Sequence, residues 1–141
     1  LRASATYTIR IGSYRDADGG DYTLRINAPS GSDERSDEIV ARNIQLNDER
    51  RGNIRRGSAV FYQFAGIANQ MVTITVNGNF DTTLTLLDSN EQSIAFDDDS
   101  GDGLNSRIFA FVLPSDDTYI IRVGSYDDRG GGDYTLSLTE E

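Results

Sequence analysis

The chain has 141 residues, 23 acidic and 13 basic side chains and a formal net charge of −10. A surface this acidic repels phosphate backbones and anionic lipids, so we expect no nucleic acid partner. No apolar run approaches the roughly 18 residues that a transmembrane helix needs, so we expect no membrane insertion.

Cysteine and histidine are absent, and every basic residue is arginine. These absences exclude a Ser-His-Asp triad, a thiol nucleophile, a Schiff-base lysine and a cysteine/histidine zinc site. Two carboxylates can run a glycosidase, but one of them must then be desolvated beside apolar walls. Here the acids cluster in glycine-rich stretches, and there is no tryptophan to hold a sugar. We therefore expect no enzymatic activity.

The chain begins with a stretch that it contains twice. Tyr7–Ile26 and Tyr119–Leu138 are 112 positions apart and, with their flanks, are identical at over half of about 26 positions without a gap. In each copy, two runs alternate apolar and polar residues with a period of two, which is typical of half-buried strands. Glycine and aspartate, which suit turns, lie between the runs. The pattern predicts a β-hairpin in each copy, the first within residues 1–27.

The predicted N-terminal hairpin needs something to cover it. An isolated hairpin is marginally stable at best, and burying each of its apolar side chains is worth roughly 1.5–3 kcal/mol. It can pack on its own downstream domain, belong to an upstream domain, or add strands to a sheet of a neighbouring chain. The last arrangement is head-to-tail and propagates as a filament. The side chains expected to make this assembly contact are Tyr7, Ile9, Ile11, Tyr22, Leu24 and Ile26.

The remaining chain predicts a linker and one domain. Residues 28–38 combine proline, glycine, serine and alternating charge, which is typical of a linker. Residues 39–46 predict an edge strand, and residues 47–57 predict a surface loop with a short strand. Further strands are predicted at about 60–64, 72–76, 83–87, 92–96, 107–113, 119–123 and 134–138. Because no segment has helical periodicity, we predict an all-β domain over residues 39–141, an antiparallel jelly-roll-like β-sandwich.

Several motifs occur in an order that resembles one family. They are Phe80–Asp88 (FDTTLTLLD), Ile94–Asp99 (IAFDDD), Leu104–Ile108 (LNSRI), Leu113-Pro114, Thr118–Val123 (TYIIRV) and Gly132–Leu136 (GDYTL). Over about residues 39–138 they resemble the bacterial pre-peptidase C-terminal domain, and residues 1–26 resemble part of a second one. The resemblance implies a non-catalytic, jelly-roll-like sandwich of secreted bacterial proteins, often beside peptidases or in tandem. It is also similar in fold to the collagen-binding domains of clostridial collagenases.

Acidic clusters are the candidate metal sites, and calcium is the expected ion. Asp97, Asp98, Asp99 and Asp102 lie in a glycine-rich loop that can wrap oxygen ligands around calcium. The alternative is a solvated turn whose aspartates cap backbone amides. The family resemblance implies calcium binding by the linker acids Asp33, Glu34, Asp37 and Glu38. The aspartates of the hairpin loops are interpreted as turn residues: Asp16, Asp18, Asp21, Asp127, Asp128 and Asp133.

Two functional hypotheses follow. The first is a non-catalytic extracellular structural or self-assembly module, a repeating sandwich of a bacterial surface array or filament. Its partners are neighbouring copies of itself or adjacent tandem domains. The second is a calcium-assisted appendage of a secreted peptidase that binds an extracellular polymer such as collagen or polysaccharide. The repeat in the residues favours the first, and the family resemblance favours the second.

Overall fold

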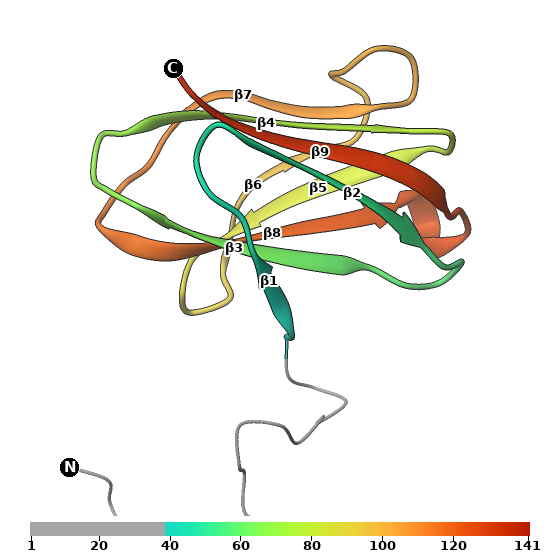
Figure 1. Cartoon of the computed structure of the whole chain (residues 1–141), viewed down its shortest axis with the longest axis horizontal. Coiled ribbons are helices and arrows are strands. Elements are labelled where there is room, and N and C mark those ends of the chain that lie inside the picture. Colours follow the sequence, from blue (N-terminus) through green and yellow to red (C-terminus); the bar gives the residue numbers. More distant parts are fainter. Residues whose placement is uncertain (1–38) are drawn as a thin grey trace, which may run out of the picture. The chain divides into compact units, whose positions relative to one another are not determined.

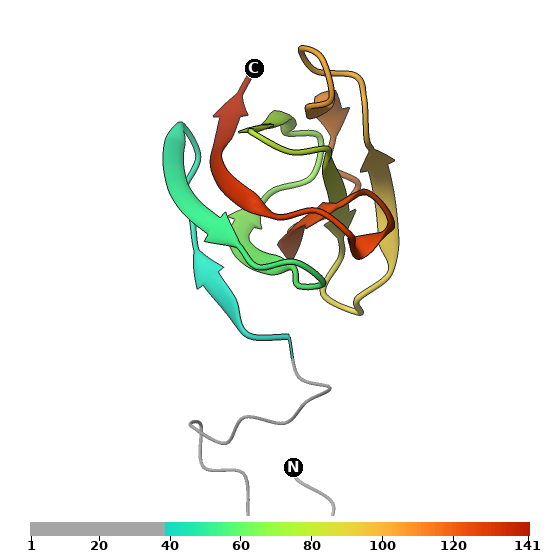
Figure 2. The same cartoon turned by 90° about the vertical axis from the view of Figure 1, so that its right-hand side faces the viewer.

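The computed structural model describes residues 39–141, which form two packed β-sheets (Figures 1 and 2). The predicted hairpin at residues 1–27 and linker at residues 28–38 lie outside the described residues. The strands are β1 (Ala41–Asn43), β2 (Asp48–Ile54), β3 (Val60–Gly66), β4 (Met71–Gly78), β5 (Thr82–Leu87), β6 (Ser93–Asp97), β7 (Ser106–Val112), β8 (Asp117–Ser125) and β9 (Gly132–Glu140). A short 3-10 turn, η2 (Tyr126–Asp128), lies between β8 and β9.

No helix within residues 39–141 is long and apolar enough to cross a membrane.

The strands alternate between the two sheets along the chain. One sheet has five strands in the order β1-β3-β8-β5-β6, and the other has four in the order β2-β9-β4-β7. Strands β5 and β6 are consecutive and pair within one sheet, whereas the other consecutive strands of the described part lie in opposite sheets. All pairs are antiparallel except β1 with β3. The predicted all-β sandwich is confirmed.

The C-terminal copy of the repeat is not a hairpin. Strand β8 pairs with β3 and β5 in the five-stranded sheet, and β9 pairs with β2 and β4 in the four-stranded sheet. Residues 113–139, which we call the closing arch, thus give each sheet an internal strand, one on either side of the core (Figure 2). The predicted pairing is wrong because alternation with a period of two marks a half-buried strand without identifying its neighbour.

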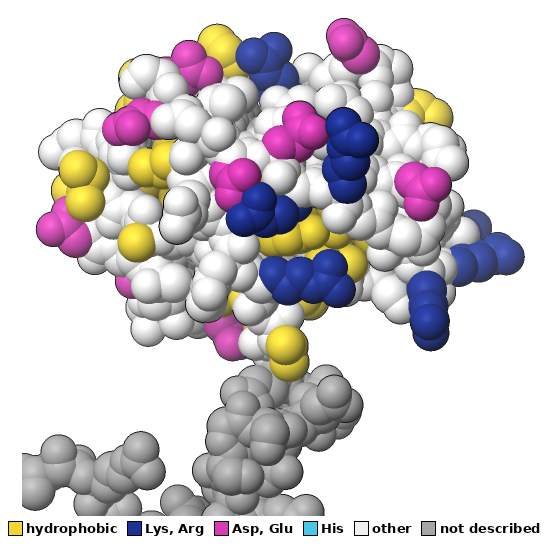
Figure 3. Space-filling model, viewed as in Figure 1, with side chains coloured by type: hydrophobic (Ala, Val, Ile, Leu, Met, Phe, Trp, Pro, Cys, Tyr) yellow, Lys and Arg dark blue, Asp and Glu magenta, His cyan; other side chains and the backbone are white. Residues whose placement is uncertain are grey.

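The two strands that precede β3 lie at sheet edges. An edge strand was predicted at residues 39–46, and β1 is at an edge but spans only Ala41–Asn43. Residues 47–57, predicted to be mainly loop, contain the seven-residue strand β2 at an edge of the other sheet. Its charged sequence, DERRGNI, hides the strand pattern but suits an edge, because charges discourage pairing with other chains. Acidic and arginine side chains are interspersed on the face shown in Figure 3.

The core lies between the inner faces of the two sheets. The five-stranded sheet contributes Tyr62, Phe64, Leu84, Leu86, Tyr119, Ile121 and Val123. The four-stranded sheet contributes Ile54, Val72, Ile74, Val76, Ile108, Tyr134, Leu136 and Leu138. Burying a side chain of this kind stabilises the fold by roughly 1.5–3 kcal/mol. Tyr119 and Tyr134 point into the core, with exposures of 0% and 3%.

Two tyrosines of the closing arch form hydrogen bonds through their hydroxyl groups, Tyr134 with another strand and Tyr119 within the arch. The hydroxyl groups of Tyr134 and Tyr62 lie 2.7 Å apart in the core and connect the two sheets. Burial and this hydrogen bond raise the pKa of Tyr134 far above its usual value. The Tyr119 hydroxyl donates to the carbonyl oxygen of Ser115 at 2.7 Å, and its ring stacks on Phe64 with centroids 5.6 Å apart. Each strand of the arch therefore contains one tyrosine whose hydroxyl group is held by a hydrogen bond.

We expect Tyr62→Phe to lower the free energy of unfolding by about 1–3 kcal/mol, because it leaves the Tyr134 hydroxyl buried without its partner. The double variant Tyr62→Phe/Tyr134→Phe is expected to lose less than Tyr62→Phe alone, since no unpaired hydroxyl then remains. Urea unfolding followed by circular dichroism measures both values. A double variant that is less stable than Tyr62→Phe would contradict this function of the hydroxyl pair.

Candidate functional site

Acidic residues gather where three loops meet at one end of the sandwich. The loops join β4 to β5, β6 to β7 and β8 to β9. The backbone N–H of Thr82 donates to the carbonyl oxygen of Leu104 at 3.0 Å, and that of Tyr126 donates to Asp81 at 3.1 Å. Residues far apart in the sequence are thereby brought together.

Buried hydroxyl groups hold the acidic loop between β6 and β7 in place. Thr82 and Ser106 are both 0% exposed. The backbone N–H of Ser106 donates to Oγ1 of Thr82 at 2.9 Å, and the Ser106 hydroxyl lies 2.8 Å from the carbonyl oxygen of Asp98. Oδ1 of Asn105 accepts the N–H of Gly78 at 2.8 Å. The loop is thus anchored to strands on both sides.

Asp97, the first residue of the predicted calcium set, is engaged in hydrogen bonds of its own loop. Its carboxylate accepts the backbone N–H of Ser100 at 3.0 Å and that of Arg107 at 2.7 Å, and it also accepts the Ser100 hydroxyl. Burial alone would raise the pKa of Asp97, but these hydrogen bonds outweigh burial and lower it. Asp97 therefore caps backbone amides of its own loop, as expected if the loop is a solvated turn.

Asp81 is a functional candidate that sequence reasoning missed. Its Oδ1 is buried and has no hydrogen-bond partner within residues 39–141. Burial raises the pKa of Asp81, and the charges of Asp99, Asp98 and Asp127 raise it further. A partly desolvated carboxylate among like charges is a place where a cation is attracted. The sequence carries no local signal for it, because Asp81 stands alone between Phe80 and Thr82.

The other predicted metal ligands within residues 39–141 are not arranged as a metal site. In the described part of the chain, no three acidic side chains are arranged as a metal-ligand group. Asp98, Asp99 and Asp102 follow Asp97 in the loop, and only Asp98 and Asp99 act on Asp81. The linker acids Asp33, Glu34, Asp37 and Glu38 lie outside the described residues. Calcium binding stays a prediction.

The aspartates interpreted as turn residues are placed as follows. Asp127 and Asp128 lie in η2, both with φ of 53°, which fits the turn interpretation. Asp128 also pairs with Arg122 at 3.3 Å. Asp133 lies in β9 instead of the turn and accepts a hydrogen bond from Nδ2 of Asn53 at 2.8 Å.

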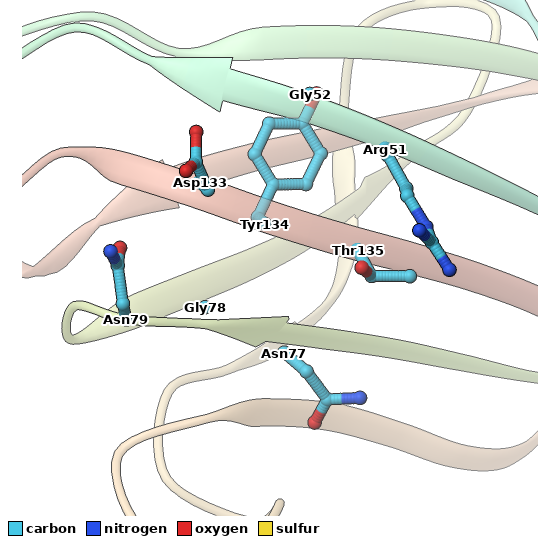
Figure 4. Close-up of a pocket in the computed structure, with 8 residues that line it drawn as sticks. All are labelled: Arg51, Gly52, Asn77, Gly78, Asn79, Asp133, Tyr134 and Thr135. Atoms are coloured by element: carbon cyan, nitrogen blue, oxygen red, sulfur yellow. The ribbon is translucent and has the colours of Figure 1, made fainter.

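A shallow polar depression of about 520 Å³ lies over the four-stranded sheet (Figure 4). It spans β2, β9 and β4, and the glycines Gly52 and Gly78 flank Tyr134 beneath it. Its remaining lining side chains are polar: Arg51, Asn77, Asn79, Asp133 and Thr135. These groups can donate and accept hydrogen bonds, and no arrangement of nucleophile and base is present among them.

Comparison with known proteins places this fold in one family. Residues 58–125 match the family described as Bacterial pre-peptidase C-terminal domain. The domain of that kind from the collagenase of Bacillus anthracis superposes with a TM-score of 0.61 at 22% identity, over 74% of this chain and 100% of the other. Residues 58–125 of the sandwich are thus similar to a pre-peptidase C-terminal domain.

The same fold also occurs in periplasmic inhibitors of g-type lysozyme. PliG of Aeromonas hydrophila, a periplasmic inhibitor of g-type lysozyme, has a TM-score of 0.56 at 16% identity, over 70% of this chain and 96% of its own. PliG of Salmonella Typhimurium has a TM-score of 0.53 at 14% identity, over 72% and 100%. No curated protein matches the chain. At these identities the structural likeness concerns the fold alone, so function must be argued from sites.

We expect Asp81→Asn to raise the melting temperature at neutral pH in a buffer without divalent cations. The raised pKa means that ionised Asp81 costs stability above its folded-state pKa, and that this cost disappears as acid protonates the carboxyl. The gain of the variant should therefore shrink between pH 7 and pH 4. Thermal unfolding at both pH values measures it.

Asp97→Asn serves as the matched control in the same end of the sandwich. The pKa of Asp97 is lowered, so its ionised form stabilises the fold at neutral pH and this contribution is lost as pH falls. The control should be less stable than the parent at pH 7, and the difference should narrow in acid. If both variants shifted the melting temperature in the same direction, the assignment of Asp81 as a destabilising carboxylate would be wrong.

Proposed function

We propose that the chain is part of a non-catalytic extracellular protein in which pre-peptidase C-terminal domains follow one another in series. The repeat of the closing arch carries this proposal. Tyr7 and Tyr119 are 112 positions apart, and the interval from residue 28 to residue 139 contains the predicted linker and one sandwich up to the end of its arch. A repeat whose period equals one domain with its linker is the signature of a tandem array.

The geometry of the arch favours a second sandwich for residues 1–27 and disfavours a hairpin that docks on a sheet edge. Strands β8 and β9 each have a neighbour on both sides, and they lie in different sheets. The apolar side chains of residues 1–27 at the matching positions would need the same surroundings. A free sheet edge offers a neighbour on one side of one sheet, so strand addition to an edge leaves the second run of the copy uncovered.

Family and composition support the non-catalytic and extracellular parts of the proposal. The chain lacks histidine, cysteine and lysine, and the polar depression holds no catalytic arrangement. A structural neighbour is the pre-peptidase C-terminal domain of a collagenase. The serial arrangement itself is supported by the repeat and by the period.

A fusion in which residues 39–112 precede Leu1 tests the serial arrangement. Because Leu1 matches Leu113 in the repeat, the junction restores the order of β7 followed by a closing arch without an inserted residue. We expect the fusion to contain two sandwiches and to unfold with about twice the calorimetric enthalpy of the 141-residue chain, since this enthalpy scales with the number of folded residues.

The control fusion carries Ile9→Asp, which places a charge where Ile121 is 0% exposed in the described sandwich. In this control the added sandwich should be unfolded, and the original sandwich should stay folded. A parent fusion whose enthalpy equals that of the 141-residue chain, with the added residues unfolded, would overturn the proposal.

A second candidate function is calcium-assisted binding of an extracellular polymer. Asp81 favours it, because its buried and unpartnered Oδ1 is surrounded by the charges of Asp99, Asp98 and Asp127. Calcium takes six to eight oxygen ligands, and loop carboxylates with backbone carbonyls are its usual source. The polar depression over the four-stranded sheet would then offer hydrogen bonds to a polymer.

If calcium binds beside Asp81, adding calcium should raise the melting temperature of the parent chain by several degrees, as binding to the native state does. Asp81→Asn should remove most of that rise, whereas Asp116→Asn, an exposed carboxylate outside the three loops, should preserve it. A magnesium titration checks that the effect is not general charge screening. No calcium effect on the parent, together with no retention on collagen or polysaccharide beads, would dismiss this candidate.

A further inference from the structure

The edge strands of the two sheets form two opposite sides of the sandwich. Strands β1 and β2 lie on one side, and β6 and β7 lie on the other (Figure 2). Within residues 39–141, β2 pairs only with β9, and β7 pairs only with β4. Each of these edges therefore leaves a row of backbone N–H and C=O groups without a strand neighbour in the described part of the chain. The two sides are the places where another sandwich can align with the sheets.

The two sides carry opposite charges. Residues 40–57, which we call the basic side, contain five arginines and two acidic residues. Residues 88–112, which we call the acidic side, contain six acidic residues and one arginine. The basic side therefore has a formal charge of +3 and the acidic side one of −5, in a chain whose net charge is −10. This separation of charge favours contact between unlike sides and opposes contact between like sides.

Arg55 and Arg56 keep their charges exposed to solvent on the basic side. The two arginines within β2 pair with acidic residues of the same strand, at 2.5 and 3.6 Å. Arg55 and Arg56 follow β2, are exposed, and form no ion pair within residues 39–141. Figure 3 views the molecule from the basic side and shows arginine side chains that project into solvent. These cations are available to carboxylates of another molecule.

The exposed charges of both sides lie at the same end of the sandwich. The backbone after β2 packs against the loop between β8 and β9, since a Cβ atom at Gly131 would lie only 2.8 Å from the nitrogen of Arg56. That loop and the acidic loop between β6 and β7 are two of the three loops that meet at this end. The acidic loop presents Asp99 and Asp102, both of which are exposed. When two copies lie side by side in the same orientation, these charges come to face each other.

The acidic side also exposes apolar side chains. Phe96, Leu104, Phe109 and Val112 are all large hydrophobic residues that are exposed. The guanidinium carbon of Arg107 lies 4.6 Å from the centre of the Phe109 ring, so this ring already accepts an arginine on its face. Arginine over an aromatic ring is a favourable contact. A partner that brings arginines and covers apolar surface therefore matches the acidic side.

The directions of the edge strands suit side-by-side repetition. All neighbours in the four-stranded sheet are antiparallel, so β2 and β7, which have seven residues each, run in opposite directions. In the five-stranded sheet β1 and β6 also run in opposite directions, because β1 is parallel to β3 and the other three pairs are antiparallel. A second copy in the same orientation thus places its β2 antiparallel to β7 of the first copy and its β1 antiparallel to β6.

A bulge in β7 gives side chains the main part in such a contact. The pairing of β4 with β7 shifts its register around Thr73, where Ala110 has a φ of 49° and its N–H donates to Oγ1 of Thr73 at 3.0 Å. Bulges of this kind interrupt the backbone ladder at a sheet edge and can redirect a neighbouring side chain. The adjacent residue is Phe109, whose side chain is exposed. A continuous sheet across two copies is therefore disfavoured, and side-chain packing with charge pairing is favoured.

We infer that the basic side of one copy of this chain binds the acidic side of a second copy, so that sandwiches associate side by side and head-to-tail. Phe96 and Phe109 provide the apolar part of the contact, and the pairing of Arg55 and Arg56 with the acidic loop sets its orientation. Because a head-to-tail contact does not close on itself, further copies can add to it. The inference concerns residues 39–141 alone and is independent of the proposed serial arrangement.

Sedimentation velocity of the full chain, in a buffer with EDTA, tests this contact. We expect the parent to sediment faster as its concentration rises from the micromolar to the millimolar range, because contacts between exposed charges and small apolar patches are weak. The variants Arg55→Glu/Arg56→Glu and Asp99→Arg/Asp102→Arg should each stay monomeric over that range.

The four substituted side chains are exposed and make no hydrogen bond within residues 39–141, so both variants should fold, which circular dichroism checks. Asp116→Arg changes an exposed residue in the loop between β7 and β8, away from both sides, and should associate as the parent does.

An equimolar mixture of the two double variants gives the most specific result. It should associate although neither variant does so alone, because each variant contributes one unchanged side and the two changed sides again have opposite charges. A parent that stays monomeric, a double variant that associates as the parent does, or a mixture that stays monomeric would overturn the inference. Association through residues 1–27 would persist in both variants and would count as the second of these outcomes. The fusion experiment tests the proposed function separately, because it measures the enthalpy of folding and not association.

Discussion

An internal strand of a sheet needs a hydrogen-bonding neighbour on each side, and the closing arch provides one such strand to each sheet of this sandwich. Without it, β3 and β5 are separated in one sheet and β2 and β4 in the other. The largest fully buried side chains include Tyr119 and Leu136 of the arch, and also Tyr62, which is hydrogen-bonded across the core to Tyr134 of the arch. The core, the link between the sheets and the meeting of the acidic loops all depend on how residues 113–139 cross the sandwich.

This constraint gives the sequence repeat its functional meaning. A repeated hairpin is a self-contained unit that can dock on a surface, whereas a repeated arch is an incomplete fragment of two sheets. A Cβ atom at Gly131 would clash with the backbone at the end of β2, and Asp133 accepts a hydrogen bond from β2; the first copy has the same residues at Gly19 and Asp21. The proposed series of similar sandwiches would account for both the retained residues and the period of the repeat.

Much of the fold could be predicted from the sequence, and the errors of that prediction have physical causes. Alternation located β3, β4, β5, β7 and the two arch strands, because each buries one face. It could not reveal that β8 and β9 belong to different sheets, since both arrangements bury the same faces of the two strands. The interval between them is longer than the two to five residues of a typical hairpin loop. This length is the one feature of the sequence that argues against a hairpin. Strand β2 was hidden by its charges, which an edge strand tolerates.

The candidate cation site shows a different limit of prediction from sequence. Sequence reasoning selected Asp97, Asp98, Asp99 and Asp102 because they are close along the chain. In the structure Asp97 caps its own loop, and the carboxylate with an unsatisfied buried oxygen is Asp81, which lies in another loop. Its neighbours Asp99 and Asp127 come from two further loops. Clustering along the sequence selects neighbours in the chain, whereas the fold brings Asp81 close to acidic residues of other loops.

The most direct test of the arch is a map of backbone proton contacts by nuclear Overhauser spectroscopy on the labelled chain. The account predicts cross-strand contacts of Ile121 with Tyr62 and Leu86, and of Leu136 with Arg50 and Val76. It predicts no backbone contacts between residues 119–123 and 134–138. A ladder of backbone contacts joining those two segments would establish a hairpin and contradict the account.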